Sequence, residues 1–140
     1  MASATVWHDV VVLGRRAARA FRLPYVRRLR FEPIPHRPSL RLDGLCWPVK
    51  GLVMIRLQRV GRPTQPLRRS TIMATLAHEL AHLREPNHDR AHGDLTRLIA
   101  AWLRLRGQPV AHRLHSGTGR SRRARGAPGF KRAWKKHRQR

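Results

Sequence analysis

Apolar residues recur at helical spacing near the start of the chain. Between residues 4 and 21 they return every three or four positions with arginines between them, at Val6, Val10, Leu13, Ala17 and Phe21. This periodicity predicts an amphipathic helix, because positions three and four apart share one face. The helix should end at Leu23-Pro24, since the residue before a proline disfavours the helical conformation.

Two more helices are predicted in the second half of the chain. Ser70 or Thr71 can cap the first of them, and its apolar residues wrap much of its circumference, which is typical of a central, buried helix. Pro86 stops it. The next helix opens at Asn87 or Asp89 and ends at Gly107, and it carries one apolar stripe: Leu95, Leu98, Ile99, Trp102 and Leu103.

Short apolar runs between the first and second helices predict strands. In the stretch YVRRLRF, residues 25–31, Leu29 and Phe31 alternate with arginines, as in a half-buried strand. Turn pairs at residues 43–44 and 50–51 bracket LCWPV, and the apolar run 52–57 follows, so one or two antiparallel hairpins are expected. Residues 33–38 and 61–66 are rich in proline or glycine and are predicted as loops.

These elements predict an α+β fold: an N-terminal helix, a small antiparallel sheet, and two later helices that pack together. The chain has 140 residues, enough for one domain of about 100 residues with extensions. We expect a domain over residues 1–111. From residue 112 to 140 the composition shifts to glycine, serine and arginine, which predicts a tail that is disordered when free.

Histidines gather in the second predicted helix and just after it. The stretch TLAHELAHLREPNHDRAHG, residues 75–93, holds four of the nine histidines of the chain. His78, Glu79 and His82 form H-E-x-x-H, and on a helix the two histidines lie one turn apart, so both imidazoles can face one ion. The alternative without a metal is that these histidines form a solvated face of the helix. In a helix this apolar, however, the two histidines and the glutamate would be buried without polar partners.

Zinc suits this pattern. A catalytic zinc needs three protein ligands and a water whose pKa falls to about 7, and Glu79 is the expected general base for that water. We expect the third ligand beyond Pro86. His88 leads, because a short turn costs less closure entropy than a long one. His92 is the alternative, and only one of the two is required.

The stretch HELAHLREPNHDRAH resembles the YgjP-like and WLM branches of the SprT-related zinc metallopeptidases, whose helix reads HELxH and whose third histidine follows after five residues. GLCWPVKGLVMIRL, which precedes it, is similar to the glycine-x-cysteine hairpin and strand of that group. The resemblance spans roughly residues 40–103. It departs at Asp43, where the group has tryptophan, and at His92, where it has an aromatic residue. It implies a zincin-type fold and peptide hydrolysis.

Other zinc hydrolase patterns fit less well. The metzincin pattern has a glycine where Glu85 stands, and its Met-turn is missing because no methionine follows Met73. A gluzincin needs a later glutamate, and none follows Glu85. The YbeY-type endoribonucleases share the spacing of His78, His82 and His88, and RNA would suit a basic protein, but Glu79 at the base position argues against them.

The charge is strongly lopsided. Lys and Arg number 31 against 7 Asp and Glu, a formal net charge of +24, which favours polyanionic partners. Residues 112–140 hold eleven basic residues and no acid. We expect this tail to bind nucleic acid, DNA in preference to RNA, through basic residues and an aromatic that can stack on bases: Arg120, Arg122, Arg123, Arg125, Lys131, Arg132, Trp134, Lys135 and Lys136. A solvated extension is the alternative.

Cysteine and hydropathy bear on location. The single cysteine, Cys46, excludes an internal disulfide and a cysteine cage for zinc, and it is expected to be buried. The longest apolar run is too short for a membrane span, so we expect a cytoplasmic protein of prokaryotic or phage origin, associated with the nucleoid in one version of this expectation.

Three functional hypotheses follow from the sequence. The first hypothesis is a zinc metalloendopeptidase acting on DNA-associated proteins. The others are a zinc-dependent ribonuclease and a non-catalytic nucleic-acid-binding protein with a structural metal site.

Overall fold

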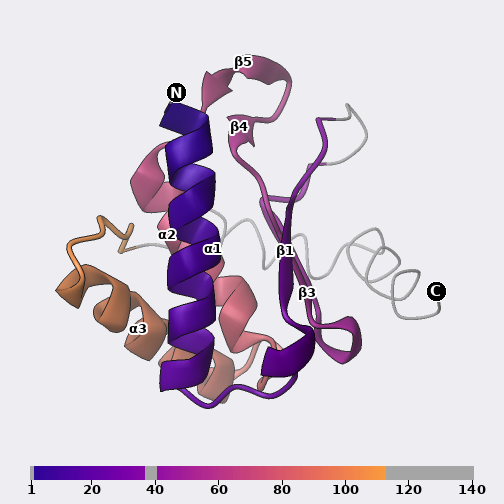
Figure 1. Cartoon of the computed structure of the whole chain (residues 1–140), viewed down its shortest axis with the longest axis vertical. Coiled ribbons are helices and arrows are strands. Elements are labelled where there is room, and N and C mark those ends of the chain that lie inside the picture. Colours follow the sequence, from indigo (N-terminus) through magenta and orange to yellow (C-terminus); the bar gives the residue numbers. More distant parts are fainter. Residues whose placement is uncertain (1, 37–40, 113–140) are drawn as a thin grey trace.

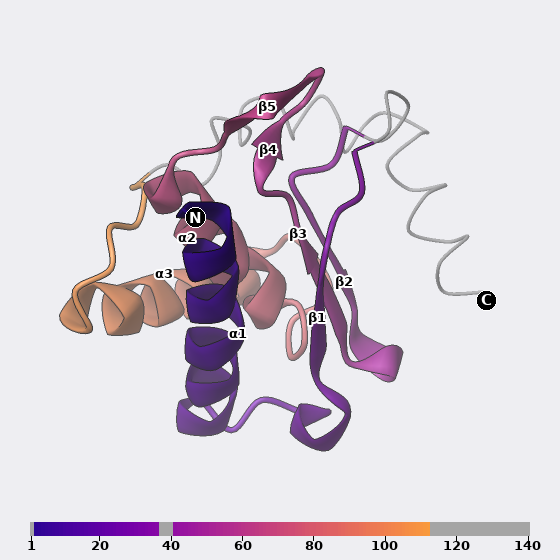
Figure 2. The same cartoon turned by 45° about the horizontal axis from the view of Figure 1, so that its top comes forward.

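The computed structural model describes residues 2–36 and 41–112. In this part of the chain three α-helices lie to one side of a small sheet (Figures 1 and 2), so the predicted α+β class is confirmed. The helices are α1 (Ala2–Ala20), α2 (Arg69–Ala81) and α3 (Arg90–Leu105), and the strands are β1 (Arg30–Pro33), β2 (Gly44–Trp47), β3 (Leu52–Ile55), β4 (Gln58–Arg59) and β5 (Arg62–Pro66). Two short 3₁₀ turns are η1 (Val26–Arg28) and η2 (Pro48–Lys50).

Helix α1 forms where the apolar periodicity predicts it. Val10, Leu13 and Ala17 are buried on its inner face, and the arginines between them stay exposed. Gly14 is needed for the approach of β1, because a Cβ at this position would lie 2.5 Å from Cζ of Phe31. The ring of Phe31 therefore packs directly on the helix backbone.

The main sheet has the strand order β1-β3-β2 and is mixed. Strands β2 and β3 pair antiparallel with Cys46 opposite Val53, which confirms the predicted hairpin, with Pro48 in the turn η2 directly after β2. Strand β1 pairs parallel to β3, with Phe31 also opposite Val53. Cys46 is fully buried, as expected.

The strand predicted over residues 25–31 is shorter and begins later. Tyr25 adopts a left-handed conformation with φ 66°, and the chain then makes the turn η1 before β1 starts at Arg30. The bend lets Leu29 enter the core while Phe31 lies on α1. A two-residue alternation describes only the end of this stretch.

The loop predicted over residues 61–66 is wrong. Strands β4 and β5 form a second, two-stranded sheet joined at Val60 and Gly61, where Gly61 has φ 76°. All five residues of β5 are exposed, so no alternation of apolar and polar residues marked it as a strand. The hairpin lies at the end of the molecule where α1 begins (Figure 2).

Helix α2 is the centre of the core. Met73, Leu76, Ala77 and Leu80 are fully buried among α1, α3 and the sheet. The predicted caps Ser70 and Thr71 are wrong: the helix begins at Arg69, after Arg68 in an extended conformation and without a side-chain cap. The guanidinium of Arg69 instead bonds Asp9 of α1 at 2.7 Å and Gln108 at 3.0 Å, which ties the start of α2 to both neighbours.

Helix α3 packs against α2 with the predicted stripe. Leu95, Ile99 and Leu103 are buried, Trp102 is half-buried and Leu98 is exposed. Of the two predicted caps, Asp89 is the one used, because its Oδ1 accepts a hydrogen bond from the backbone N–H of His92 at 3.0 Å.

Within the part of the chain that the structure describes, none of these helices is long and apolar enough for a bilayer crossing. The predicted basic tail begins at His112, the last described residue. Its proposed nucleic-acid-binding residues lie outside the described residues: Arg120, Arg122, Arg123, Arg125, Lys131, Arg132, Trp134, Lys135 and Lys136.

Candidate metal centre

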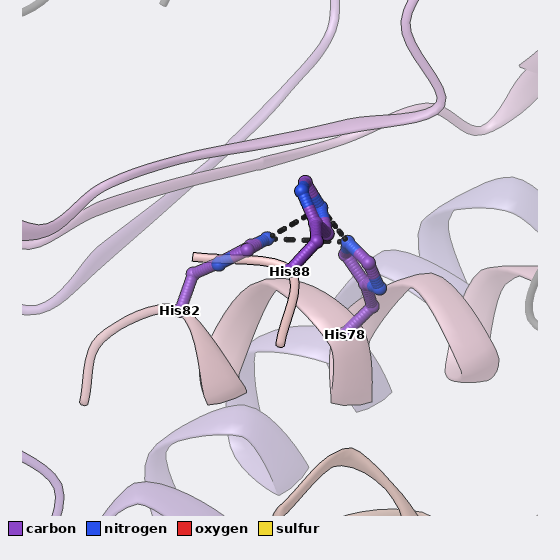
Figure 3. A group of neighbouring side chains, drawn as sticks. All are labelled: His78, His82 and His88. Atoms are coloured by element: carbon purple, nitrogen blue, oxygen red, sulfur yellow. Dashed lines mark hydrogen bonds between the residues drawn. The ribbon is translucent and has the colours of Figure 1, made fainter. Parts of the chain in front are cut away.

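Three imidazoles converge at the end of α2. His78 and His82 lie one helical turn apart, and His88 comes from the loop that turns back after the helix (Figure 3). The Nε2 atoms of His78 and His82 are 3.2 Å apart, and the Nε2 of His88 lies 3.1 Å from each of them. In the described residues this is the group that could hold a metal ion.

The ring of His82 is held in one orientation. Its Nδ1 lies 2.9 Å from the backbone oxygen of Glu85, so Nδ1–H donates to that carbonyl and Nε2 keeps its lone pair for the centre of the cluster. Burial, and then the neighbouring His92 and His88, lower the pKa of His82 to about 3. The ring is therefore neutral at physiological pH, the form that binds a metal ion.

The donor set fits zinc. A tetrahedral zinc ion with Zn–N bonds of about 2.0 to 2.1 Å separates its nitrogen ligands by about 3.3 to 3.4 Å. The three separations of 3.1 to 3.2 Å are close to this spacing. Three neutral imidazoles can each donate the lone pair of Nε2 to one ion. Without an ion, the three Nε2 atoms face one another with too few protons for each to be hydrogen-bonded.

His92, the alternative third ligand, lies behind this cluster. It is buried, its Nε2 lies 3.0 Å from the backbone oxygen of His78, and its ring stacks on that of His82 with centroids 4.0 Å apart. The structure thus brings His88 to His78 and His82. His92 points instead to the backbone of His78. His92 supports the rings and the helix from the side of α3.

Glu79 lies next to the cluster and faces β2. It is almost fully buried, and it lies against the backbone of Gly44, the first residue of β2, as Thr75 also does. Burial, and then the charge of Asp43, raise the pKa of Glu79 to about 8. The proximity of Asp43 and Gly44 to Glu79 could not be seen from the sequence, since 35 positions separate Gly44 from Glu79.

Gly44 leaves room for Glu79, and alanine there is expected to displace it. An added Cβ would lie 2.6 Å from Cγ2 of Thr75 and 2.7 Å from Oε2 of Glu79. Overpacking of this kind costs about 1 to 3 kcal/mol of stability, which urea unfolding of Gly44→Ala measures. Gly93→Ala is the matched control, because its added Cβ meets nothing nearer than Nη1 of Arg97 at 3.7 Å. Equal stability of the two variants would contradict the close contact at Gly44.

The metal-free protein is expected to have a stability plateau in pH. The raised pKa of Glu79 makes a contribution that is complete below its ordinary value of 4.5 and is lost as pH rises through about 8. The lowered pKa of His82 makes a contribution that is complete above its ordinary value of 6.5 and is lost as pH falls through about 3. Between pH 4.5 and 6.5 the contribution of Glu79 to the free energy of unfolding falls with pH while that of His82 rises, so the two changes cancel. Below and above this range the free energy of unfolding decreases.

Urea unfolding of chelator-treated protein at a series of pH values measures this plateau. Asp43 and His92 shift in the same directions as Glu79 and His82 and add to the two slopes. The Glu79→Gln variant should lose most of the decline on the alkaline side. A wild-type stability that keeps rising from pH 6.5 to 8 would contradict the burial of Glu79 as a protonated group.

Comparison with known structures gives a likeness in fold. A crystal structure of a Wss1 mutant from Saccharomyces cerevisiae is similar over 74% of this chain and 82% of its own, with a TM-score of 0.61 and 17% identity. A second crystal structure of Wss1 from the same yeast is similar over 55% of this chain and 62% of its own, with a TM-score of 0.48 and 24% identity. No family model and no curated protein matches the sequence. At 17% identity the first likeness establishes the fold alone.

Proposed function

We propose that this chain is a zinc-dependent metallopeptidase that acts on proteins associated with nucleic acid. One observation carries the proposal: three imidazole nitrogens meet within 3.2 Å of one another, and the residue after the first of these histidines is a buried glutamate on the same helix. The α+β fold agrees with the zincin-type fold that the sequence resemblance implies.

Each side chain has a role in this proposal. His78, His82 and His88 would hold the ion through Nε2. A bound zinc ion would supply a Lewis acid that polarises the carbonyl of the scissile bond. Glu79 would take a proton from the attacking water and pass it to the leaving amine, which its burial favours because a buried carboxylate is a stronger base than a solvated one.

The open edge of the main sheet, at β2, is a second observation in favour of a peptide substrate. Strand β2 pairs with β3 on one side, and in the described part of the chain no strand covers its other side. An extended peptide can add to such an edge through backbone hydrogen bonds. Gly44 begins this strand and lies against Glu79, so a peptide along β2 would pass the proposed base.

The positive charge of the chain supports the proposal that its substrates are associated with nucleic acid. A formal net charge of +24 attracts nucleic acid by releasing its counterions, whether or not any base sequence is read. In this proposal the basic residues of the tail, 112–140, tether the domain to DNA, and proteins bound to the same DNA become its substrates. The tail thus raises the local concentration of substrate without taking part in the reaction.

The test offers two substrates to the zinc-loaded protein: casein and a structured RNA. We expect casein to be cleaved, cleavage to stop when a chelator removes the metal, and RNA to stay intact. Cleavage of RNA with casein intact would favour the ribonuclease instead, for which the high positive charge is the supporting observation. Metal binding without cleavage of either substrate would favour a structural metal site.

A further inference from the structure

We infer that the folded domain carries its own binding surface for the phosphate backbone of nucleic acid, separate from the tail. We call it the arginine surface. It lies where α1 ends and the chain turns through η1 into β1, and it consists of Arg15, Arg19, Arg22, Arg27, Arg28 and Arg84. All six side chains belong to exposed residues.

The charge of this end of the molecule is not neutralised locally. Seven arginines and no acid occur between Asp9 and Glu32. In the described part of the chain, Arg30, Arg69, Arg90 and Arg97 form ion pairs, and Arg56 interacts with the charge of Asp43. None of these belongs to the arginine surface, so its guanidinium groups keep their positive charge available for an external anion.

The fold gathers these arginines from three segments. Nη1 of Arg15 on α1 donates to the backbone oxygen of Leu29 at 3.2 Å, which joins the helix to the end of η1. Nη1 of Arg28 donates to the oxygen of Val49 at 3.4 Å, and Nη2 of Arg84 donates to the backbone oxygens of Phe21 and Arg22. Figure 1 shows the end of α1 and the turn into β1 together at its lower end.

These contacts hold three of the six side chains, those of Arg15, Arg28 and Arg84, in place for binding. Each of the three hydrogen-bonded arginines uses one nitrogen on one or two neutral carbonyls, and a guanidinium has further N–H groups for a phosphate. Arg15 and Arg19 are four positions apart on α1 and therefore share one face. Side chains that are already held in place lose less conformational entropy when a phosphate binds.

A nucleic acid fits this surface better than a membrane. Membrane binding needs a broad apolar face beside the basic one. The large exposed apolar side chains of the described residues are Tyr25, Val49, Leu98 and Leu105, and only the first two lie near the arginine surface. Tyr25 sits between Arg22 and Arg27 in the chain, where its ring can stack on an unpaired base. A single-stranded or partly unpaired nucleic acid is therefore the favoured ligand.

One arginine of the surface follows a histidine of the cluster closely in the chain. Arg84 lies two residues after His82, and it reaches the end of α1 with its side chain. The arginine surface is thus joined through Arg84 to the segment that carries His82. If the proposed peptidase function holds, the surface presents proteins attached to a bound nucleic acid to Glu79. The binding itself does not depend on that function.

The test compares two triple variants of the full chain. Arg19→Gln, Arg22→Gln and Arg27→Gln remove three charges from the arginine surface, and none of these side chains makes a hydrogen bond or ion pair among those described. Arg59→Gln, Arg62→Gln and Arg68→Gln remove three exposed charges from the opposite end, at the β4–β5 hairpin and the start of α2. The probe is a fluorescent oligonucleotide, as single-stranded DNA, duplex DNA and single-stranded RNA.

Fluorescence anisotropy at about 50 to 200 mM salt gives the slope of log affinity against log salt. We expect the first triple variant to have a slope shallower by about 2 to 3 than wild type, and the control variant to change less. Unchanged slopes, or equal losses in both variants, would overturn the arginine surface. A loss of binding to anionic lipid vesicles, with oligonucleotide binding kept, would overturn it in favour of a membrane. Cleavage of a free peptide, measured on the same samples, reports separately on the peptidase proposal.

Discussion

The Glu79→Gln variant is expected to hydrolyse peptides about 100 to 10,000 times more slowly than wild type while still binding zinc. Glutamine has nearly the same size as glutamate, so the packing against Gly44 can be kept. It cannot accept the proton of the attacking water. The measurement is the rate of casein or peptide cleavage, together with the zinc content of the same preparation.

Glu32→Gln is the matched control for this variant. Glu32 is an exposed glutamate of β1 that pairs loosely with Arg30, at 3.9 Å, so its replacement makes the same change of side chain outside the candidate metal centre. We expect the control to cleave at the wild-type rate. Full activity of Glu79→Gln would refute its role as the base. RNA cleavage that survives in this variant would point to the ribonuclease instead.

The His88→Ala variant is expected to lose high-affinity zinc binding. It removes one of three Nε2 donors, and the two that remain, His78 and His82, leave the ion with only two protein ligands. His92→Ala should have a smaller effect, about 10- to 100-fold in affinity, because it removes a support of the rings rather than a donor. Isothermal titration with zinc measures both affinities.

His36→Ala controls for the general loss of an imidazole, because His36 is exposed and lies outside the cluster. Its zinc affinity should equal that of wild type. If His92→Ala bound zinc more weakly than His88→Ala, the assignment of the third ligand would be reversed. If all three variants bound zinc as wild type does, the cluster would not be the metal site.

Much of the candidate site is visible in the sequence. The spacing of His78 and His82 places two imidazoles on one side of any helix, and the apolar residues around them predict that the helix is buried. For the third ligand, the sequence reduces the candidates only to two histidines. His88 and His92 both follow Pro86 closely, and the choice depends on how the loop between α2 and α3 turns. Asp89 caps α3 through the N–H of His92, which directs His92 to the backbone of His78.

The helices and the β2–β3 hairpin were predicted because each leaves a local signature: an apolar period of three to four residues, or two apolar runs around a turn. The parallel pairing of β1 with β3 leaves no such signature, because its partners are 22 positions apart, as in Arg30 opposite Leu52. The exposed hairpin of β4 and β5 has no apolar pattern at all. The left-handed conformation of Tyr25 likewise has no signature in the sequence.

The sequence by itself determined the class of fold, the helix that carries the H-E-x-x-H pattern, and the excess of positive charge. Only the tertiary structure decided which histidine joins the pair, that Gly44 makes room for Glu79, and that arginines from α1, η1 and the end of α2 share one surface. The physical reason is that a side-chain period along one element is a local property of the chain. Contacts between distant segments depend instead on how the whole core packs, and no short stretch of sequence records that.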